Sequence, residues 1–157
     1  MNAERKGAFV AGVGASAGGL ESLERFFRAM PARSGVAFVI VQHLSPDHKS
    51  LMEELFTRFT AMPVREARHG ERVEPDHIYL LPPGKEIEIS AGCLQVTDRP
   101  AERYLSFPID RFLTSLAVEC GPHAVGVILS GSGSDGSRGI RRVRAAGGLV
   151  LVEDPEA

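Results

Sequence analysis

Apolar runs alternate with amphipathic stretches in the first third of the chain. Residues 8–13 and 36–41 are continuous apolar runs, typical of parallel strands that are covered on both faces. Between them, residues 20–30 carry apolar side chains at helical spacing, and Pro31 ends the pattern. A second helix is predicted from residues 50–53, Ser-Leu-Met-Glu, which have the spacing of a capping box. The pattern therefore predicts strand, helix, strand, helix.

The same alternation returns near the end of the chain. A helix is predicted from Pro108, and the apolar runs 124–129 and 149–152 flank a further helix through Ile140 and Val143. Strands that alternate with helices indicate an α/β fold. We expect a doubly wound, mainly parallel sheet with right-handed crossovers and helices on both faces.

The middle of the chain has a different pattern. Residues 63–67, 78–81, 86–89 and 94–97 are typical of short strands. Ala-Gly at residues 91–92, between the last two, indicates a turn of a hairpin. We expect this hairpin to be a small antiparallel addition to the sheet.

Length and composition fit one globular domain, residues 1–157. The chain is 43% hydrophobic and 24% charged, and this length can bury a core of its own. The sequence stops soon after the last predicted strand, where a closing helix is expected. The domain is therefore predicted to be truncated at its C-terminal end.

Charge and cysteine usage exclude several classes of protein. A net charge of −2 gives no basic field that would attract nucleic acid or anionic lipid. The first apolar stretch is broken by Gly12 and Gly14, and is too short for a signal sequence or a membrane span. Cys93 and Cys120 form neither a CxxC pair nor a disulfide framework. We expect a cytoplasmic protein with no nucleic-acid partner and no membrane insertion.

Three turns that follow predicted parallel strands carry a serine, a histidine and an aspartate. In open α/β sheets, the loops beyond the carboxyl ends of the strands converge on one crevice. Ser16, His43 and Asp135 are therefore expected to meet there, and together they have the composition of a hydrolytic triad. Their predicted roles are nucleophile, general base and the acid that orients the base.

The serine turn has two interpretations. Residues 14–18, Gly-Ala-Ser-Ala-Gly, fit a nucleophile elbow between strand and helix. The stretch from Gly12 also resembles a loose dinucleotide fingerprint, and on the pattern alone the two weigh about equally. A dinucleotide site needs an acid at the end of the next strand, but that strand ends in Gln42 and His43. A candidate base in place of the acid favours the nucleophile.

Other residues compete for these roles. His48 shares the loop of His43 and is kept as a spare base, while Asp47 and Asp110 are the competing acids. Asp135 also has a structural interpretation as a helix N-cap. Asp110 lies in the first turn of its helix, where an acid is favoured without any catalytic role.

A basic run lies on the predicted helix that follows Asp135. Its members are Arg138, Arg141, Arg142 and Arg144. Such runs are mostly solvated helix faces, and docking of an acidic protein surface is the alternative.

Four stretches match the landmarks of a known family. They are residues 14–19 (Gly-Ala-Ser-Ala-Gly-Gly), 41–44 (Val-Gln-His-Leu), 70–79 (Gly-Glu-Arg-Val-Glu-Pro-Asp-His-Ile-Tyr) and 129–136 (Leu-Ser-Gly-Ser-Gly-Ser-Asp-Gly). In this order they resemble the chemotaxis methylesterase family, CheB, over nearly the whole chain. Residues 41–50 and 108–112 are most similar to a subgroup in which the methylesterase domain precedes a CheR-type methyltransferase and sensory segments.

The resemblance implies a function for the three turns. Ser16 matches the family's nucleophile, His43 its base and Asp135 the acid that orients the base. The family hydrolyses glutamate methyl esters on cytoplasmic chemoreceptor helices, releasing methanol, and deamidates certain glutamines. It needs no metal or cofactor. Beside the site, Ala17 and Ser132 stand where members commonly carry Thr and Met.

The resemblance also implies partners. They are methylated chemoreceptor helices and a CheR-type methyltransferase, fused or separate. Two alternatives stay open: a regulatory binding module that keeps the shape of the triad but turns over little, and a nucleotide-binding fold that uses the glycine turns.

Overall fold

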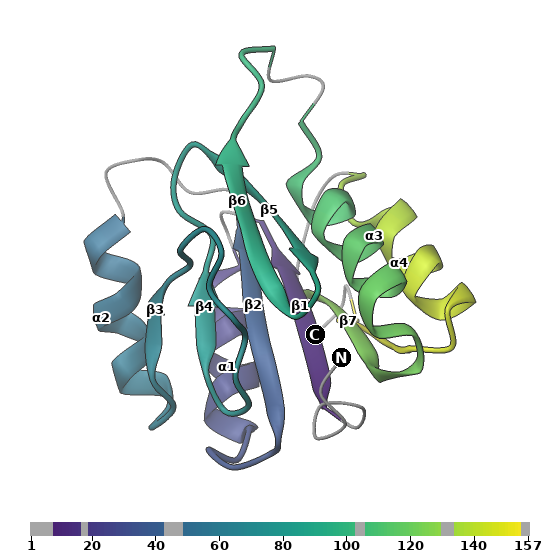
Figure 1. Ribbon diagram of the computed structural model, residues 1–157. Coiled ribbons are helices and arrows are strands. Elements are labelled where there is room, and N and C mark those ends of the chain that lie inside the picture. Colours follow the sequence, from purple (N-terminus) through teal and green to yellow (C-terminus); the bar gives the residue numbers. More distant parts are fainter. Residues whose placement is uncertain (1–7, 17–18, 43–48, 103–105, 130–133, 155–157) are drawn as a thin grey trace.

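The main sheet has six parallel strands in the order β3-β4-β2-β1-β7-β8 (Figure 1). The computed structural model describes residues 8–16, 19–42, 49–102, 106–129 and 134–154. The strands are β1 (Phe9–Ala15), β2 (Val36–Gln42), β3 (Val64–Glu66), β4 (Ile78–Leu80), β7 (Ala124–Leu129) and β8 (Leu149–Val152). The chain builds outward from β1 in one direction and then returns to its other side, which confirms the predicted doubly wound fold.

Helices cover both faces of this sheet. They are α1 (Leu20–Ala29), α2 (Lys49–Phe59), α3 (Pro108–Cys120) and α4 (Ser137–Ala145), and a short 3₁₀ turn, η4 (Gly121–His123), follows α3. Buried residues of α1 and α2 form one apolar cluster with the sheet, and those of α3 and α4 form another on the opposite face. None of the helices in the described ranges is long and apolar enough to cross a membrane.

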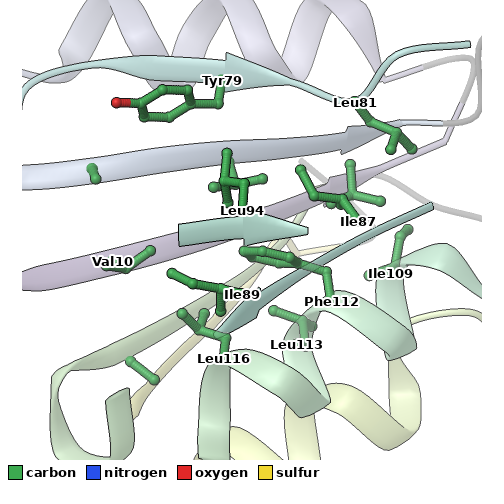
Figure 2. Packing of buried hydrophobic residues seen from close by; sticks show 14 of the residues in the cluster. Val10, Tyr79, Leu81, Ile87, Ile89, Leu94, Ile109, Phe112, Leu113 and Leu116 are labelled. Carbon is green, nitrogen blue, oxygen red and sulfur yellow. The ribbon is translucent and has the colours of Figure 1, made fainter. Parts of the chain in front are cut away.

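The predicted hairpin forms, but it does not extend the main sheet. It consists of β5 (Lys85–Ser90) and β6 (Cys93–Asp98), which pair antiparallel as a separate two-stranded sheet. Ile87, Ile89 and Leu94 are buried against Phe112 and Leu116 of α3 (Figure 2). The hairpin therefore lies over the face of the sheet that α3 covers, because its apolar side chains are buried there.

An aromatic cluster anchors α1 to the opposite face. The Phe27 ring is almost fully buried and meets the rings of Phe26, Phe38 and Phe56 edge-to-face, with centroids 5.0, 5.2 and 5.4 Å apart. Aromatic pairs prefer this geometry. Since α1 begins at Leu20, soon after β1 ends, the cluster also fixes the far side of the turn that contains Ser16.

Candidate functional site

Three neighbouring strands end at the same level. Ala15, the last residue of β1, is the register partner of Gln42 in β2 and of Leu129 in β7. The strand order reverses at β1, which is where ligand sites form in open α/β sheets. Ser16 follows Ala15 directly, so the structure places the predicted nucleophile at this edge.

Ser16 lies on the strand-to-helix turn that the sequence predicts. Its side chain is half-buried, and its backbone oxygen accepts hydrogen bonds from the Gly19 backbone nitrogen at 2.9 Å and from Gln42 Nε2 at 3.0 Å. The Gly19 oxygen in turn accepts from the Leu23 nitrogen, inside α1. The serine is thus held between the end of β2 and the amino end of α1.

Gln42 is a site residue that sequence reasoning passed over. Its side chain is almost fully buried, and within the described ranges its Oε1 atom has no hydrogen-bond partner. The sequence feature that could have indicated it is that Gln42 is the single polar residue of its strand, at the last position. Buried amides normally have partners, and the donor of this one is satisfied by the bond to Ser16.

Asp135 caps a helix, but not the helix that follows it. Its Oδ2 accepts from the Ile109 backbone nitrogen at 3.0 Å, and its Oδ1 accepts from the Asp110 nitrogen at 2.8 Å, both in the first turn of α3. The N-cap of α4 is Gly136, which makes no side-chain cap. An ionised carboxylate has about four lone-pair sites, so accepting two backbone N–H groups is compatible with a further bond from an imidazole N–H.

Asp110, the competing acid, is also engaged. Its Oδ1 accepts from the backbone nitrogens of Gly136 at 3.0 Å and Gly139 at 2.7 Å, at the start of α4. It lies in the first turn of α3, as expected, but the amino end that it caps belongs to α4. His43, the predicted base, lies outside the described residues, as do His48 and Asp47.

A glycine lets α3 approach the end of β1. A Cβ atom at Gly14 would lie 2.6 Å from Cγ2 of Ile109, closer than side chains approach. Ile109 is buried and gives its backbone nitrogen to Asp135. The small residue two positions before Ser16 thus brings the amino end of α3, and Asp135 with it, to the carboxyl end of β1.

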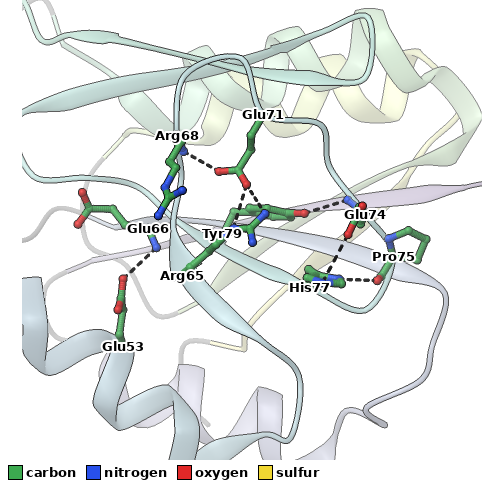
Figure 3. A network of polar contacts seen from close by, with 9 residues as sticks. All are labelled: Glu53, Arg65, Glu66, Arg68, Glu71, Glu74, Pro75, His77 and Tyr79. Carbon is green, nitrogen blue, oxygen red and sulfur yellow. Dashed lines mark hydrogen bonds and ion pairs between the residues drawn. The ribbon is translucent and has the colours of Figure 1, made fainter.

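The family-like stretch 70–79 has a structural role. The Glu71 carboxylate accepts from the Arg65 guanidinium and, at 2.6 Å, from the Arg68 backbone nitrogen (Figure 3). Tyr79 is fully buried and its hydroxyl oxygen accepts from the Glu74 nitrogen at 2.9 Å. Burial raises the pKa of Tyr79, and hydrogen bonding to Glu71 raises the pKa of Arg65. These contacts stabilise the β3–β4 edge.

The basic run on α4 is a solvent-facing surface. Arg138, Arg141, Arg142 and Arg144 are exposed, and none has an ion pair with another described residue. Over the described part of the chain, no group of three or more His, Cys, Asp or Glu side chains is arranged to hold a metal ion. The chemistry available at the strand ends is that of the serine turn and of Asp135.

Fold and site together define a class: a doubly wound parallel α/β domain with a serine turn after its central strand. The family model described as CheB methylesterase matches residues 11–157, and the chain belongs to this family. This confirms the resemblance seen in the sequence. The fusion to a CheR-type methyltransferase stays a prediction.

Named relatives agree with this assignment. Over 146 residues, 90% of this chain, it is 38% identical to "Protein-glutamate methylesterase/protein-glutamine glutaminase 1" of Xanthomonas euvesicatoria and 34% identical to the protein of the same activity in Escherichia coli K12. The chain spans 40% and 42% of the length of these relatives. The crystal structure of the Thermotoga maritima CheB methylesterase catalytic domain matches with a TM-score of 0.85 and 26% identity, covering 95% of this chain and 81% of that one.

Proposed function

We propose that this chain is a protein-glutamate methylesterase domain, a serine hydrolase that removes methyl esters from chemoreceptor glutamates and deamidates certain glutamines. The observation that best supports this proposal is that β1, β2 and β7 end at the same position along the sheet, where Ala15 pairs with both Gln42 and Leu129. Ser16 follows the first of these residues and His43 the second in sequence. The names of the relatives supply the substrate class.

The proposed reaction has two covalent steps. Ser16 Oγ attacks the ester carbonyl of the glutamyl side chain while His43 takes the hydroxyl proton. Main-chain N–H groups of the serine turn stabilise the oxyanion that forms. When the intermediate collapses, the C–O bond to the methoxy group breaks, and His43 returns the proton to give methanol. Water, deprotonated by His43, then hydrolyses the acyl-enzyme, which frees the glutamate and Ser16.

Asp135 orients the base in this proposal. Backbone N–H groups at Ile109 and Asp110 donate to its carboxylate at 3.0 and 2.8 Å, which fixes the orientation of the carboxylate. A carboxylate held in this way keeps the imidazole in one tautomer and stabilises the imidazolium that forms when Ser16 attacks.

The partners follow from the chemistry. The substrate is a methylated chemoreceptor cytoplasmic helix, so we place the domain in the cytoplasm. A CheR-type methyltransferase, fused or separate, must install the esters that this domain removes. The net charge of −2 agrees with a domain that neither binds nucleic acid nor inserts into membranes.

A serine-directed fluorophosphonate and a methylated receptor fragment test the proposal. The intact chain should be labelled and should release methanol, while Ser16→Ala and His43→Ala should lose both activities. Ser90→Ala, at the exposed end of β5, is the matched control and should behave as wild type.

Two results would overturn the assignment. Receptor binding without methanol release would replace it by the regulatory binding module. Labelling that survives in Ser16→Ala would show that another residue is the nucleophile.

A further inference from the structure

The amino ends of α3 and α4 cap each other. Asp135, just before α4, accepts from the first backbone N–H groups of α3, at Ile109 and Asp110. Asp110, in the first turn of α3, accepts from Gly136 and Gly139 at the start of α4. Each helix thus receives its cap from the other, and the two helices lie side by side (Figure 1).

We propose that Asp110 is a positioning residue for Asp135, and that its carboxylate sets where the triad acid points. This inference rests on the proposed function of Asp135. Because Gly136 N and the Asp135 carbonyl belong to one peptide unit, the 3.0 Å bond from Gly136 to Asp110 fixes the plane of that unit. The backbone from which the Asp135 side chain projects is thereby held.

Gly136 has a backbone conformation that depends on being held. Its φ of 106° lies in a region that other residues rarely adopt, and an added Cβ would lie 2.8 Å from Cδ1 of Ile128. Glycine has the widest backbone freedom of all residues, so the chain at this point needs an external restraint to keep one conformation. The Asp110 carboxylate supplies that restraint.

Hydrogen bonds run both ways between Asp110 and the segment Asp135–Gly136. The Asp110 backbone nitrogen donates to Asp135 Oδ1 at 2.8 Å, while the Asp110 side chain accepts from the nitrogen after Asp135 at 3.0 Å. A shift of either residue therefore lengthens both bonds. An ordinary helix cap acts on its own helix and would give no such coupling to the triad acid.

Asp76 offers a matched control at the opposite end of the sheet. Its Oδ1 accepts from the backbone nitrogens of Ser34 and Gly35, both at 2.8 Å, just before β2 begins. It is the same residue type, and one oxygen again holds two N–H groups. Removing the Asp76 carboxylate should lower the stability of the fold but leave the structure at the carboxyl ends of the strands unchanged.

Steady-state hydrolysis of a glutamyl methyl ester substrate by the intact chain tests the inference. Asp110→Ala should lower kcat at least tenfold with KM changed less than twofold, while Asp76→Ala should keep the wild-type kcat despite a lower Tm. Asp110→Asn, which keeps an acceptor oxygen in place, should recover most of the rate. Asp110→Glu keeps the charge on α3 but moves the oxygens by one methylene, so it should stay folded and lose kcat.

Amide hydrogen exchange separates failure of this inference from failure of the proposed function. In Asp110→Ala, exchange should accelerate at Gly136 and Gly139 and also at Ile109, whose acceptor belongs to Asp135. An unchanged rate at Ile109 would overturn the inference, as would a loss of kcat no larger than in Asp76→Ala. If the wild-type protein hydrolyses no ester, the proposed function is wrong. The exchange pattern alone then tests whether Asp110 positions Asp135.

Discussion

The side-chain nitrogen of Gln42 donates a hydrogen bond to the backbone oxygen of Ser16, and the two atoms lie 3.0 Å apart. This bond joins the end of β2 to the turn that follows β1. Gln42 is also the residue directly before His43 in the sequence. The side chain that holds the serine turn therefore belongs to the neighbour of the proposed base. The Oε1 atom of the same amide is buried and has no partner among the described residues.

Gln42→Leu should separate stability from activity. The substitution loses one hydrogen bond, worth about 1 kcal/mol, but also removes a buried unpartnered acceptor that costs about 1–3 kcal/mol. The free energy of unfolding in urea should therefore stay within about 1 kcal/mol of wild type or rise. Ester hydrolysis should fall about tenfold, or about 1.4 kcal/mol in activation free energy, because the Ser16 backbone loses the hydrogen bond that ties it to the end of β2.

Gln42→Glu is the companion variant. A buried carboxylate here would place its negative charge against the partial negative charge of the Ser16 backbone oxygen. This variant should therefore lose more than about 2 kcal/mol of stability. A Gln42→Leu protein with the wild-type rate would show that the Gly19 bond alone holds the turn.

Gly14→Ala should destabilise the domain by about 1–3 kcal/mol, because the added Cβ collides with Ile109. Ile109→Ala alone should cost about 2–5 kcal/mol through the cavity that it leaves. The double variant should cost less than the sum of the two, since the smaller side chain makes room for the methyl group. Urea unfolding of all four proteins gives the coupling energy, and strict additivity would contradict the contact.

Local patterns predicted most of the fold. Apolar runs such as residues 36–41 are typical of strands covered on both faces, so the parallel sheet could be predicted from single segments. The place of the β5–β6 hairpin could not, because it depends on where α3 presents Phe112 and Leu116. Packing between elements that are far apart in the sequence leaves no local pattern from which it could be predicted.

The positions of two proposed site residues could be predicted from the sequence, but their contacts could not. Ser16 and Asp135 lie on the expected turns. Sequence reasoning about helix caps, however, assigns an aspartate to the helix that directly follows it. Here Asp135 caps α3 and Asp110 caps α4, and the close approach of these two helices requires Gly139, where an added Cβ would lie 2.6 Å from Cβ of Leu113. The roles of Ser16, His43 and Asp135 stay predictions.

Stability should fall with rising pH between about 9 and 11, in part through Cys120. Burial, and secondly the charge of Glu119, raise the pKa of Cys120 from an ordinary 9.0 to about 11. Over this window the unfolded chain releases the thiol proton while the folded chain retains it, so unfolding becomes more favourable as pH rises. Cys120→Ala should flatten the slope of unfolding free energy against pH.

The reactivity of this thiol gives an independent measurement. Since the thiolate is the reactive form, iodoacetamide should modify Cys120 of the folded protein slowly at pH 8 and faster as pH approaches 11. Cys93→Ala leaves Cys120 as the single thiol for this assay. Rapid modification of the folded protein at pH 8 would contradict the raised pKa.

Phe27→Ala should cost about 3–5 kcal/mol of unfolding free energy, because the ring is buried among three others. Phe26→Ala, one residue earlier and half-buried, is the matched comparison and should cost less. Thermal unfolding followed by circular dichroism measures both. Equal losses would show that α1 is not anchored mainly through Phe27.

The strand order has a consequence for synthesis on the ribosome. β1 is the first strand made and pairs with β2 soon after, yet its other neighbour, β7, begins only at Ala124. Until then one edge of β1 is unpaired in the nascent chain and is available for incorrect pairing. β1, the strand that Ser16 follows, therefore gains its second neighbour only late in synthesis, and such non-local pairing is expected to slow folding.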